Sequence, residues 1–237
     1  MTDKITSRQN AVVQKLRKLF ADASYRRDSG LFAGAGGKLR EDYLSAGGVE
    51  SGVYTSGEMT PDLLSYITGM QSPPDCVFYG EIPKFESPDF ARCLILEDVQ
   101  DPGNVGTMIR SAAAFGIDAV ILAGDCADPW QLKVLRGSMG AVFRQPLLTL
   151  DCEQVHAVLE RGKLPLYSAV AHGGEDVREV RLPERFAIAI GNEGHGLRQS
   201  TLDNSAGLIR IPISAESESL NAAAAASILL WELVGRK

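Results

Sequence analysis

The part of the chain after residue 90 alternates short apolar runs with helical segments and glycine turns. The apolar runs cover residues 93–97, 119–123, 164–171, 186–191 and 208–213. Continuous apolar strands separated by helices are typical of a parallel sheet that helices cover on both faces. Ligands of such α/β sheets bind at the carboxyl ends of the strands, so we look for chemistry in the loops after these runs.

The first part of the chain has a different pattern. Residues 7–22 place apolar side chains at helical spacing, which predicts an amphipathic helix with Ser7 as its N-cap and its basic side chains turned mostly outward. Short apolar runs and glycines follow, and prolines gather between residues 72 and 90. We therefore predict a small α/β domain at residues 1–75, a linker at residues 76–90 and a second domain at residues 91–237.

Composition restricts the cellular setting and the kinds of site. The chain has 237 residues, 45% of them apolar, and no run approaches the roughly 18 apolar residues that cross a bilayer. Its polar start lacks the apolar stretch of a signal peptide, so we expect a cytoplasmic protein with no membrane segment. The four cysteines form no CxxC pair and the three histidines lie far apart, so we expect neither disulfides nor a metal site.

The net charge of -6 argues against a nucleic-acid partner until its distribution is considered. The first 40 residues carry nine lysines and arginines against three acidic residues, which leaves the remainder of the chain at -12. This concentration of basic charge suits contact with phosphates. A solvated amphipathic helix is the simpler interpretation of the charge alone.

The first chemical loop follows residues 93–97 and leads into a helix expected at residues 105–115. Asn104 is a candidate N-cap for that helix, and Gly106 leaves backbone space beside a ligand. Arg110 falls about one and a half turns into the helix, near the ligand end of the sheet. A capped helix with an ordinary surface arginine would produce the same pattern.

Two further loops follow later strands. Residues 191–197 contain three glycines and one charged residue, Glu193, and such a loop lets backbone atoms approach a ligand closely. Residues 214–226 gather polar groups at the start of a helix expected at residues 219–234. Capping by Ser219 would explain part of that group, but it leaves Asn221 unexplained.

Together these loops resemble the three signature motifs of the SpoU, or TrmH-like, family of RNA ribose 2'-O-methyltransferases. The matching residues are Asn104, Gly106 and Arg110 in the first motif, Gly191, Asn192, Glu193, Gly194 and Gly196 in the second, and Ile211, Pro212, Glu218, Ser219, Leu220 and Asn221 in the third. A further segment at residues 132–147 matches at Arg136, Ser138, Gly140 and Phe143. The motifs follow the family order across residues 91–237, which makes coincidence a remote explanation.

The resemblance implies an enzyme of the EC 2.1.1 class that transfers a methyl group from S-adenosylmethionine to a ribose 2'-hydroxyl in RNA, without a metal. It also implies a homodimer and a trefoil knot in the second domain, which periodicity would not predict because knots are nearly absent from proteins. Ribosomal RNA is favoured over transfer RNA, because the N-terminal part resembles the L30e-like substrate-binding domain of members that methylate ribosomal RNA.

The resemblance also assigns roles to individual residues. It implies a catalytic site of Asn104, Arg110, Glu193, Ser219 and Asn221, and a cofactor site at Gly191, Ile211 and Leu220. The family assigns activation of the 2'-hydroxyl to the matched Arg110, but a guanidinium stays protonated in proteins. Our hypothesis is that Arg110 binds a substrate phosphate and stabilises the developing alkoxide.

RNA contacts are predicted from the basic N-terminal segment, from the L30e-like segment that contains Ala35, and from residues 132–147, which resemble the SpoU family. They comprise Arg8, Lys15, Lys18, Lys38 and Arg136. Ala35 stands where the L30e-like segment usually has a glutamate, which changes the expected contacts with RNA without affecting the methyl-transfer site.

Other functions fit fewer of these residues. Residues 34–39 superficially resemble a phosphate loop of an oxidoreductase or an NTPase, but Leu39 stands where a dinucleotide fingerprint needs glycine and a Walker A loop needs serine or threonine. A non-catalytic RNA-binding protein with a methyltransferase fold, a transfer RNA ribose methyltransferase and a base methyltransferase remain as alternatives.

Overall fold

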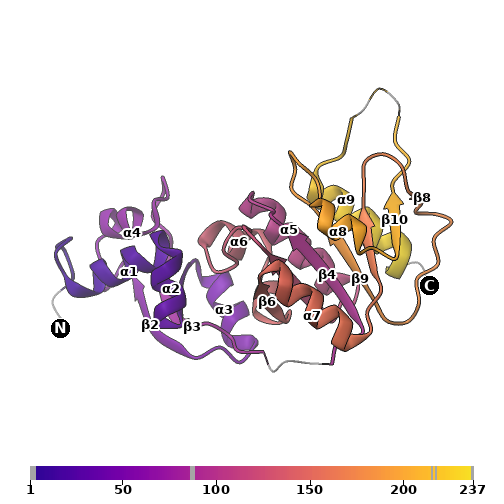
Figure 1. The fold of residues 1–237 in the computed structure, drawn as a ribbon. Coiled ribbons are helices and arrows are strands. Elements are labelled where there is room, and N and C mark those ends of the chain that lie inside the picture. Colours follow the sequence, from indigo (N-terminus) through magenta and orange to yellow (C-terminus); the bar gives the residue numbers. More distant parts are fainter. Residues whose placement is uncertain (1–3, 86–88, 215, 217, 236–237) are drawn as a thin grey trace.

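Two domains make up the computed structural model, which describes residues 4–85, 89–214, 216 and 218–235 (Figure 1). The connection between them runs from residue 82 to residue 91. Residues 86–88 of the linker expected from the sequence lie outside the described residues. No described helix is long and apolar enough to cross a membrane.

The N-terminal domain is a three-stranded antiparallel sheet with helices on both faces. Its strands are β1 (Leu31–Ala35), β2 (Glu50–Thr55) and β3 (Cys76–Glu81), and its helices are α1 (Ala11–Ala21), α2 (Ala23–Ser29), α3 (Gly37–Ser45) and α4 (Pro61–Thr68). The strand order β1-β3-β2 puts β3 in the centre, paired with both neighbours. The prediction that the linker begins at residue 76 was therefore wrong, because residues 76–81 complete this sheet.

Strand alternation divides the N-terminal sheet into two buried faces. Ala33, Ala35 and Val77 belong to one apolar cluster with the buried residues of α1 and α4. Phe32 and Phe78, which point to the other face, belong to the same apolar cluster as the core of the second domain. One face of the N-terminal sheet is therefore packed directly against the second domain.

Helix α1 begins three residues later than the sequence pattern indicated. The N-cap is Asn10, whose side chain accepts a hydrogen bond from the backbone N–H of Val12 at 2.9 Å. Ser7 instead accepts from the N–H of Gln9 within the preceding turn. The predicted cap at Ser7 was wrong because a second capping residue lies closer to the first apolar turn.

The C-terminal domain is a seven-stranded parallel sheet, which confirms the predicted α/β class. Its order is β6-β5-β4-β9-β7-β10-β8. The strands are β4 (Arg92–Glu97), β5 (Ala119–Ala123), β6 (Leu147–Leu150), β7 (Leu166–Ala169), β8 (Glu175–Asp176), β9 (Phe186–Ile190) and β10 (Gly207–Arg210). All five predicted apolar runs contain strands, whereas the edge strands β6 and β8 were missed.

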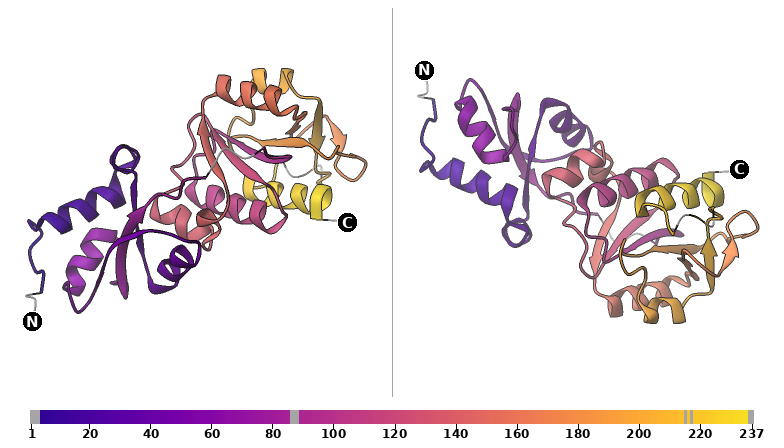
Figure 2. Two further views of the ribbon diagram at one scale, coloured as in Figure 1. Left: turned by 90° about the horizontal axis from the view of Figure 1, so that it is seen from below. Right: turned by 90° about the horizontal axis from the view of Figure 1, so that it is seen from above.

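Helices cover both faces of this sheet (Figure 2). The helical segments are α5 (Pro102–Ala114), α6 (Leu132–Gly137), the 3-10 turn η1 (Ala141–Phe143), α7 (Cys152–Gly162), α8 (Gln199–Asp203), α9 (Ala222–Leu230) and the π-helical turn η2 (Trp231–Gly235). Leu94 and Leu96 of β4 pack with residues of α5 and α9, and Cys93 and Ile95 pack with residues of α7. The trefoil knot implied by the family resemblance stays a prediction.

Two helix caps and one glycine have roles different from those expected. Asp101 caps α5, and Asn221 caps α9 by accepting from two backbone N–H groups, so Asn104 and Ser219 are not the caps. A Cβ added at Gly106 would lie 2.8 Å from the carbonyl oxygen of Val134, so this glycine allows close packing of α5 on α6. The expectation that Gly106 leaves space for a ligand was wrong.

An ion pair and aromatic contacts join the two domains. Arg26 of α2 is only 4% exposed, and its guanidinium donates to Asp128, with a shortest N–O distance of 2.5 Å. The Phe32 ring lies 5.8 Å from Trp130 and 5.5 Å from Phe143, measured between ring centroids. These contacts fix the N-terminal domain against the segment between β5 and α6 and against η1 of the second domain.

Candidate active site

A chain of side-chain hydrogen bonds connects three loops at the carboxyl edge of the sheet. Asn104 donates from Nδ2 to Oε1 of Glu193 at 2.6 Å. Asn221 donates from Nδ2 to Oδ1 of Asn104 at 3.0 Å. The folded sheet thus gathers one residue from each of the three chemical loops into a single polar cluster.

The caps of α5 and α9 hold the members of this cluster in place. Asp101 accepts from the backbone N–H of Asn104 at 2.9 Å, which leaves the Asn104 amide side chain free to bond outside its own helix. This hydrogen bond, and to a lesser extent one from Lys133, lowers the pKa of Asp101 below its ordinary value, although desolvation acts in the opposite direction. The Asn221 side chain accepts from the N–H groups of Ala223 and Ala224, so its donor group points at Asn104 with little freedom.

A pocket of about 490 Å³ lies beside the cluster. Gly191, Glu193, Ile211, Ser219 and Leu220 all line it, which places the three predicted cofactor residues on one cavity. Asn104, Arg110 and Asn221 are not among its lining residues. The predicted site residues therefore divide into a group around the pocket and a group at or beyond its edge.

Residues 191–197 form a tight turn at the wall of the pocket. The backbones of Asn192 and Gly196 exchange two hydrogen bonds, of 3.1 and 2.9 Å. The Asn192 side chain accepts from the N–H groups of Gly194 and His195 inside the turn. A Cβ added at Gly191 would lie 2.3 Å from the carbonyl carbon of Gly196, so the turn closes this tightly only with glycine there.

A fourth loop, absent from the sequence interpretation, completes the pocket. The end of β7 and the loop after it contribute Ala169, Val170, Ala171 and His172 to the lining. The strand itself was predicted, and β7 lies between β9 and β10 in the sheet. The rule that ligands bind at the carboxyl ends of parallel strands, applied to this strand too, would have found the loop.

Arg110 lies apart from the polar cluster. It sits six residues after Asn104 on α5, about 9 Å along the helix axis, and its side chain is exposed. No hydrogen bond or ion pair joins it to another described residue. The guanidinium is therefore available to a ligand that approaches from outside the pocket.

The predicted RNA-binding residues lie in varied environments. Arg8, Lys15 and Lys18 rest over the rings of Tyr66, Tyr79 and Tyr25, at 4.2, 4.3 and 5.5 Å from the ring centroids. Lys38 is largely exposed and pairs with Asp42 at 3.0 Å, and this hydrogen bond raises the pKa of Lys38. The Arg136 side chain on α6 is exposed, and its guanidinium makes no hydrogen bond or ion pair with the described part of the chain.

Comparison with known proteins shows which family has this arrangement. Residues 91–231 match the SpoU rRNA Methylase family. The chain belongs to this family. The match spans the whole parallel sheet and the three motif loops, which confirms the resemblance drawn from the motifs.

Relatives of the SpoU family resemble both domains of the chain. The 23S rRNA (guanosine(2553)-2'-O)-methyltransferase RlmP of Bacillus subtilis is 29% identical over 246 residues, covering 98% of this chain and 99% of its own. An AdoMet-bound rRNA methyltransferase from Sinorhizobium meliloti superposes with a TM-score of 0.86 at 28% identity, covering 97% of this chain and 96% of its own. The SpoU methyltransferase AviRb from Streptomyces viridochromogenes, in complex with AdoMet, gives 0.87 at 26% identity, covering 96% and 98%.

Proposed function

We propose that this protein transfers the methyl group of S-adenosylmethionine to a ribose 2'-hydroxyl of ribosomal RNA. The observation that carries the proposal is the hydrogen-bonded chain of Glu193, Asn104 and Asn221 beside a pocket lined by Gly191 and Leu220. Relatives named as 2'-O-methyltransferases of 23S rRNA, and similar structures with AdoMet bound, support the same assignment.

The pocket fits S-adenosylmethionine in size and in the character of its walls. A volume of about 490 Å³ lies within the range of roughly 300 to 1,000 Å³ usual for small-molecule sites. Ile190, Ile211 and Leu220 offer apolar surface for the adenine, while the backbone of residues 191–197 offers polar groups. When bound, the cofactor supplies an electrophilic methyl group on its sulfonium.

The polar cluster orients the ribose. Asn104 is held between Glu193 and Asn221, so its amide cannot rotate without breaking two hydrogen bonds. Catalysis by positioning needs this kind of fixed geometry, because an in-line attack tolerates little misalignment. Glu193 is exposed at the edge of the pocket, where its carboxylate can accept a hydrogen bond from a substrate hydroxyl.

Arg110 acts on the RNA backbone. Its exposed guanidinium, free of partners among the described residues, forms a fork that matches two phosphate oxygens. A permanently protonated group beside the attacking oxygen stabilises negative charge as the hydroxyl loses its proton. The proton of the hydroxyl passes to solvent water, because the protonated guanidinium cannot accept it.

The N-terminal domain, which we assign to residues 1–81, holds the RNA substrate. Arg8, Lys15 and Lys18 carry charge for phosphates, and the tyrosine rings beneath them hold these cations in place. Lys38 and Arg136 extend this contact toward the second domain, which we assign to residues 92–237. The likeness of the first domain to the L30e fold stays a prediction.

We also infer that the protein acts as a homodimer in the cytoplasm. Ile228 is 40% exposed and Trp231 is 54% exposed, both near the end of α9, which packs against α5. Apolar side chains of this size on adjoining turns suit a subunit interface. A partner placed there would lie beside the helix that carries Arg110.

The test is a methyl-transfer assay on ribosomal RNA with variants of the exposed arginine. Arg110→Ala is expected to lower kcat by about a hundredfold or more, the effect of losing one electrostatic stabiliser. Arg110→Lys should recover only part of this loss, because an ammonium cannot form a fork. Arg161→Ala, which removes an exposed helical arginine from α7, is the control and should leave kcat unchanged. Near wild-type activity of Arg110→Lys would contradict the role given to the guanidinium.

A further inference from the structure

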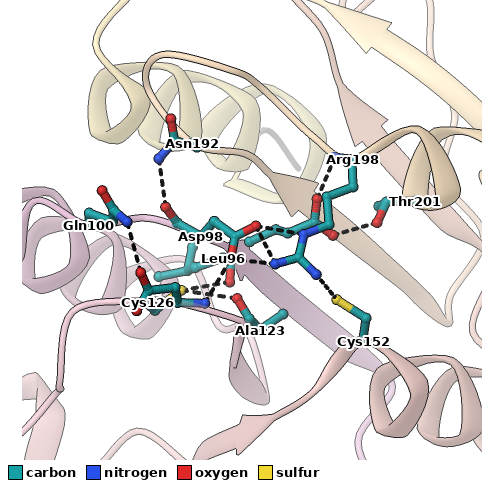
Figure 3. Close-up of polar contacts among 11 residues, drawn as sticks. Leu96, Asp98, Gln100, Ala123, Cys126, Cys152, Asn192, Arg198 and Thr201 are labelled. Carbon is teal, nitrogen blue, oxygen red and sulfur yellow. Dashed lines mark hydrogen bonds and ion pairs between the residues drawn. The ribbon is translucent and has the colours of Figure 1, made fainter.

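A second polar network lies behind the pocket and centres on Arg198, the residue that follows the 191–197 turn (Figure 3). Its guanidinium donates from Nε to Oδ2 of Asp98 at 2.7 Å and from Nη2 to Oδ1 at 2.8 Å. Nη1 bonds to Sγ of Cys152 at 2.8 Å. The backbone N–H of Arg198 donates to Oε1 of the buried Glu97 at 2.6 Å.

Asp98, the residue after β4, also binds the beginning of the turn. Asn192 donates from Nδ2 to the carbonyl oxygen of Asp98 at 2.8 Å. Both ends of residues 192–198 are thereby attached to residues 97 and 98, three to four residues before the cap of α5. The position of Glu193 relative to Asn104 therefore depends on these attachments.

The backbone around Asp98 adopts an uncommon conformation that this network supports. Asp98 has φ 55°, a left-handed value that is rare for a residue with a side chain. Its carboxylate also accepts from the N–H of Asp125 at 2.7 Å. A Cβ at Gly124 would lie 2.3 Å from Oδ1 of Asp98 and 2.8 Å from Nη2 of Arg198, so the ion pair fits only over a glycine.

The charges of the pair are both present at neutral pH. Desolvation opposes ionisation of Asp98, but the hydrogen bonds from Arg198 and from the N–H of Asp125 outweigh it, and the pKa of Asp98 lies below its ordinary value. The Arg198 side chain is 45% exposed. Ion pairs exposed to this extent contribute only about 0 to 1 kcal/mol to folding, so stability is a poor explanation for this arrangement.

We propose that Arg198 is a positioning residue for methyl transfer: its fork on Asp98 sets the separation of the two loops that carry Asn104 and Glu193. This inference rests on the proposed function. Without the fork, the turn keeps its internal hydrogen bonds and the bonds from the Arg198 backbone N–H to Glu97 and from Asn192 to the Asp98 carbonyl. It loses the two guanidinium hydrogen bonds that tie its end to the Asp98 carboxylate. Both the wall of the pocket and the bond between Asn104 and Glu193 then become variable.

The test compares Arg198→Met and Arg198→Lys with Arg185→Met. Arg185 provides a matched control, because its guanidinium also binds a carboxylate, Asp89, at 2.7 Å but lies at the amino end of β9, the opposite edge of the sheet. Arg198→Met is expected to retain its melting temperature within a few degrees. It should weaken S-adenosylmethionine binding about tenfold and lower kcat, whereas the control keeps both values.

Two further readouts separate positioning from a general structural role. Arg198→Lys should restore part of the S-adenosylmethionine binding, because lysine can still form a single hydrogen bond. Adding Asp98→Asn to Arg198→Met should cause little further loss of binding, because the two residues act as one unit. Amide exchange of Gly194 and His195 should be faster in Arg198→Met. Wild-type cofactor binding, kcat and exchange in Arg198→Met would overturn the inference.

Amide exchange also distinguishes this inference from the proposed function. A wild-type protein that transferred no methyl group would refute the function. Faster exchange confined to residues 191–198 in Arg198→Met would still support the attachment of the turn to β4. Unchanged exchange would refute it whatever the reaction.

Discussion

Arg26→Met removes a guanidinium that lies buried between the two domains. Arg26 donates from Nε to Oδ2 of Asp128 at 2.7 Å and from Nη1 to the carbonyl oxygen of Leu19 at 2.6 Å. The substitution keeps most of the apolar stem and removes all of these donors. It leaves the Asp128 carboxylate, only 20% exposed, without its counter-charge.

The magnitude follows from the burial of the two partners. Breaking a fully buried pair by removing one partner costs about 3 to 5 kcal/mol. Water can reach part of the Asp128 carboxylate, so we expect a loss of about 2 to 4 kcal/mol of unfolding free energy for Arg26→Met. Asp128→Asn should cost less, because the amide oxygen still accepts a hydrogen bond from the guanidinium.

Equilibrium unfolding in urea measures both variants and their combination. The double variant should lose clearly less than the sum of the single losses, because each single change already removes the charged pair. Arg178→Met is the control: its guanidinium approaches Asp176 to the same 2.5 Å, but the arginine side chain is 65% exposed. The control is expected to lose little or no unfolding free energy, because water screens an exposed ion pair. A loss for Arg26→Met no larger than that of the control would refute the reasoning.

Three further predictions concern a buried phenol and two closely packed glycines. Burial raises the pKa of Tyr43 to about 12, so the stability present below about pH 10 should fall as pH rises toward 12, and urea unfolding of Tyr43→Phe should show a smaller fall. Gly106→Ala should lose about 1 to 3 kcal/mol in urea unfolding, whereas Gly137→Ala, whose Cβ meets nothing nearer than 3.5 Å, should change little. Gly191→Ala should abolish S-adenosylmethionine binding in calorimetry, and wild-type affinity would contradict the tight turn.

The central strands could be predicted from the sequence because burial on both faces leaves a continuous apolar run. The strands β4, β5 and β9 show this pattern over nearly their whole length. The edge strand β6 is half-exposed, and β8 has two residues, so neither produces such a run. Strand β3 was missed for another reason, since the prolines on both sides of it indicated a linker.

The exact starts of the helices could not be predicted from residue types. Ser219 and Asn221 are both good caps, and Asp101 and Asn104 are too, so local preference leaves the register open by two or three residues. Tertiary contacts decide between them, because Asn104 is bound by Glu193 and Asn221. The choice of cap is therefore coupled to assembly of the site.

The residues that form the site could be predicted only from the family motifs. Asn104 and Asn221 are 117 positions apart, and they meet because of the order of strands in the sheet, which no local pattern gives. The attachment of Arg198 to Asp98 joins residues 100 positions apart, and nothing in the sequence of either loop indicates it.

The central claim is methyl transfer to a ribose of ribosomal RNA, and identification of the product nucleoside tests it most directly. Total RNA from cells that lack this protein is incubated with the protein and labelled S-adenosylmethionine, the RNA classes are separated, and each is digested to nucleosides. We expect a labelled 2'-O-methyl nucleoside in ribosomal RNA that is absent with Arg110→Ala. A label on a base, a label confined to transfer RNA, or no label from protein that binds the cofactor would contradict it.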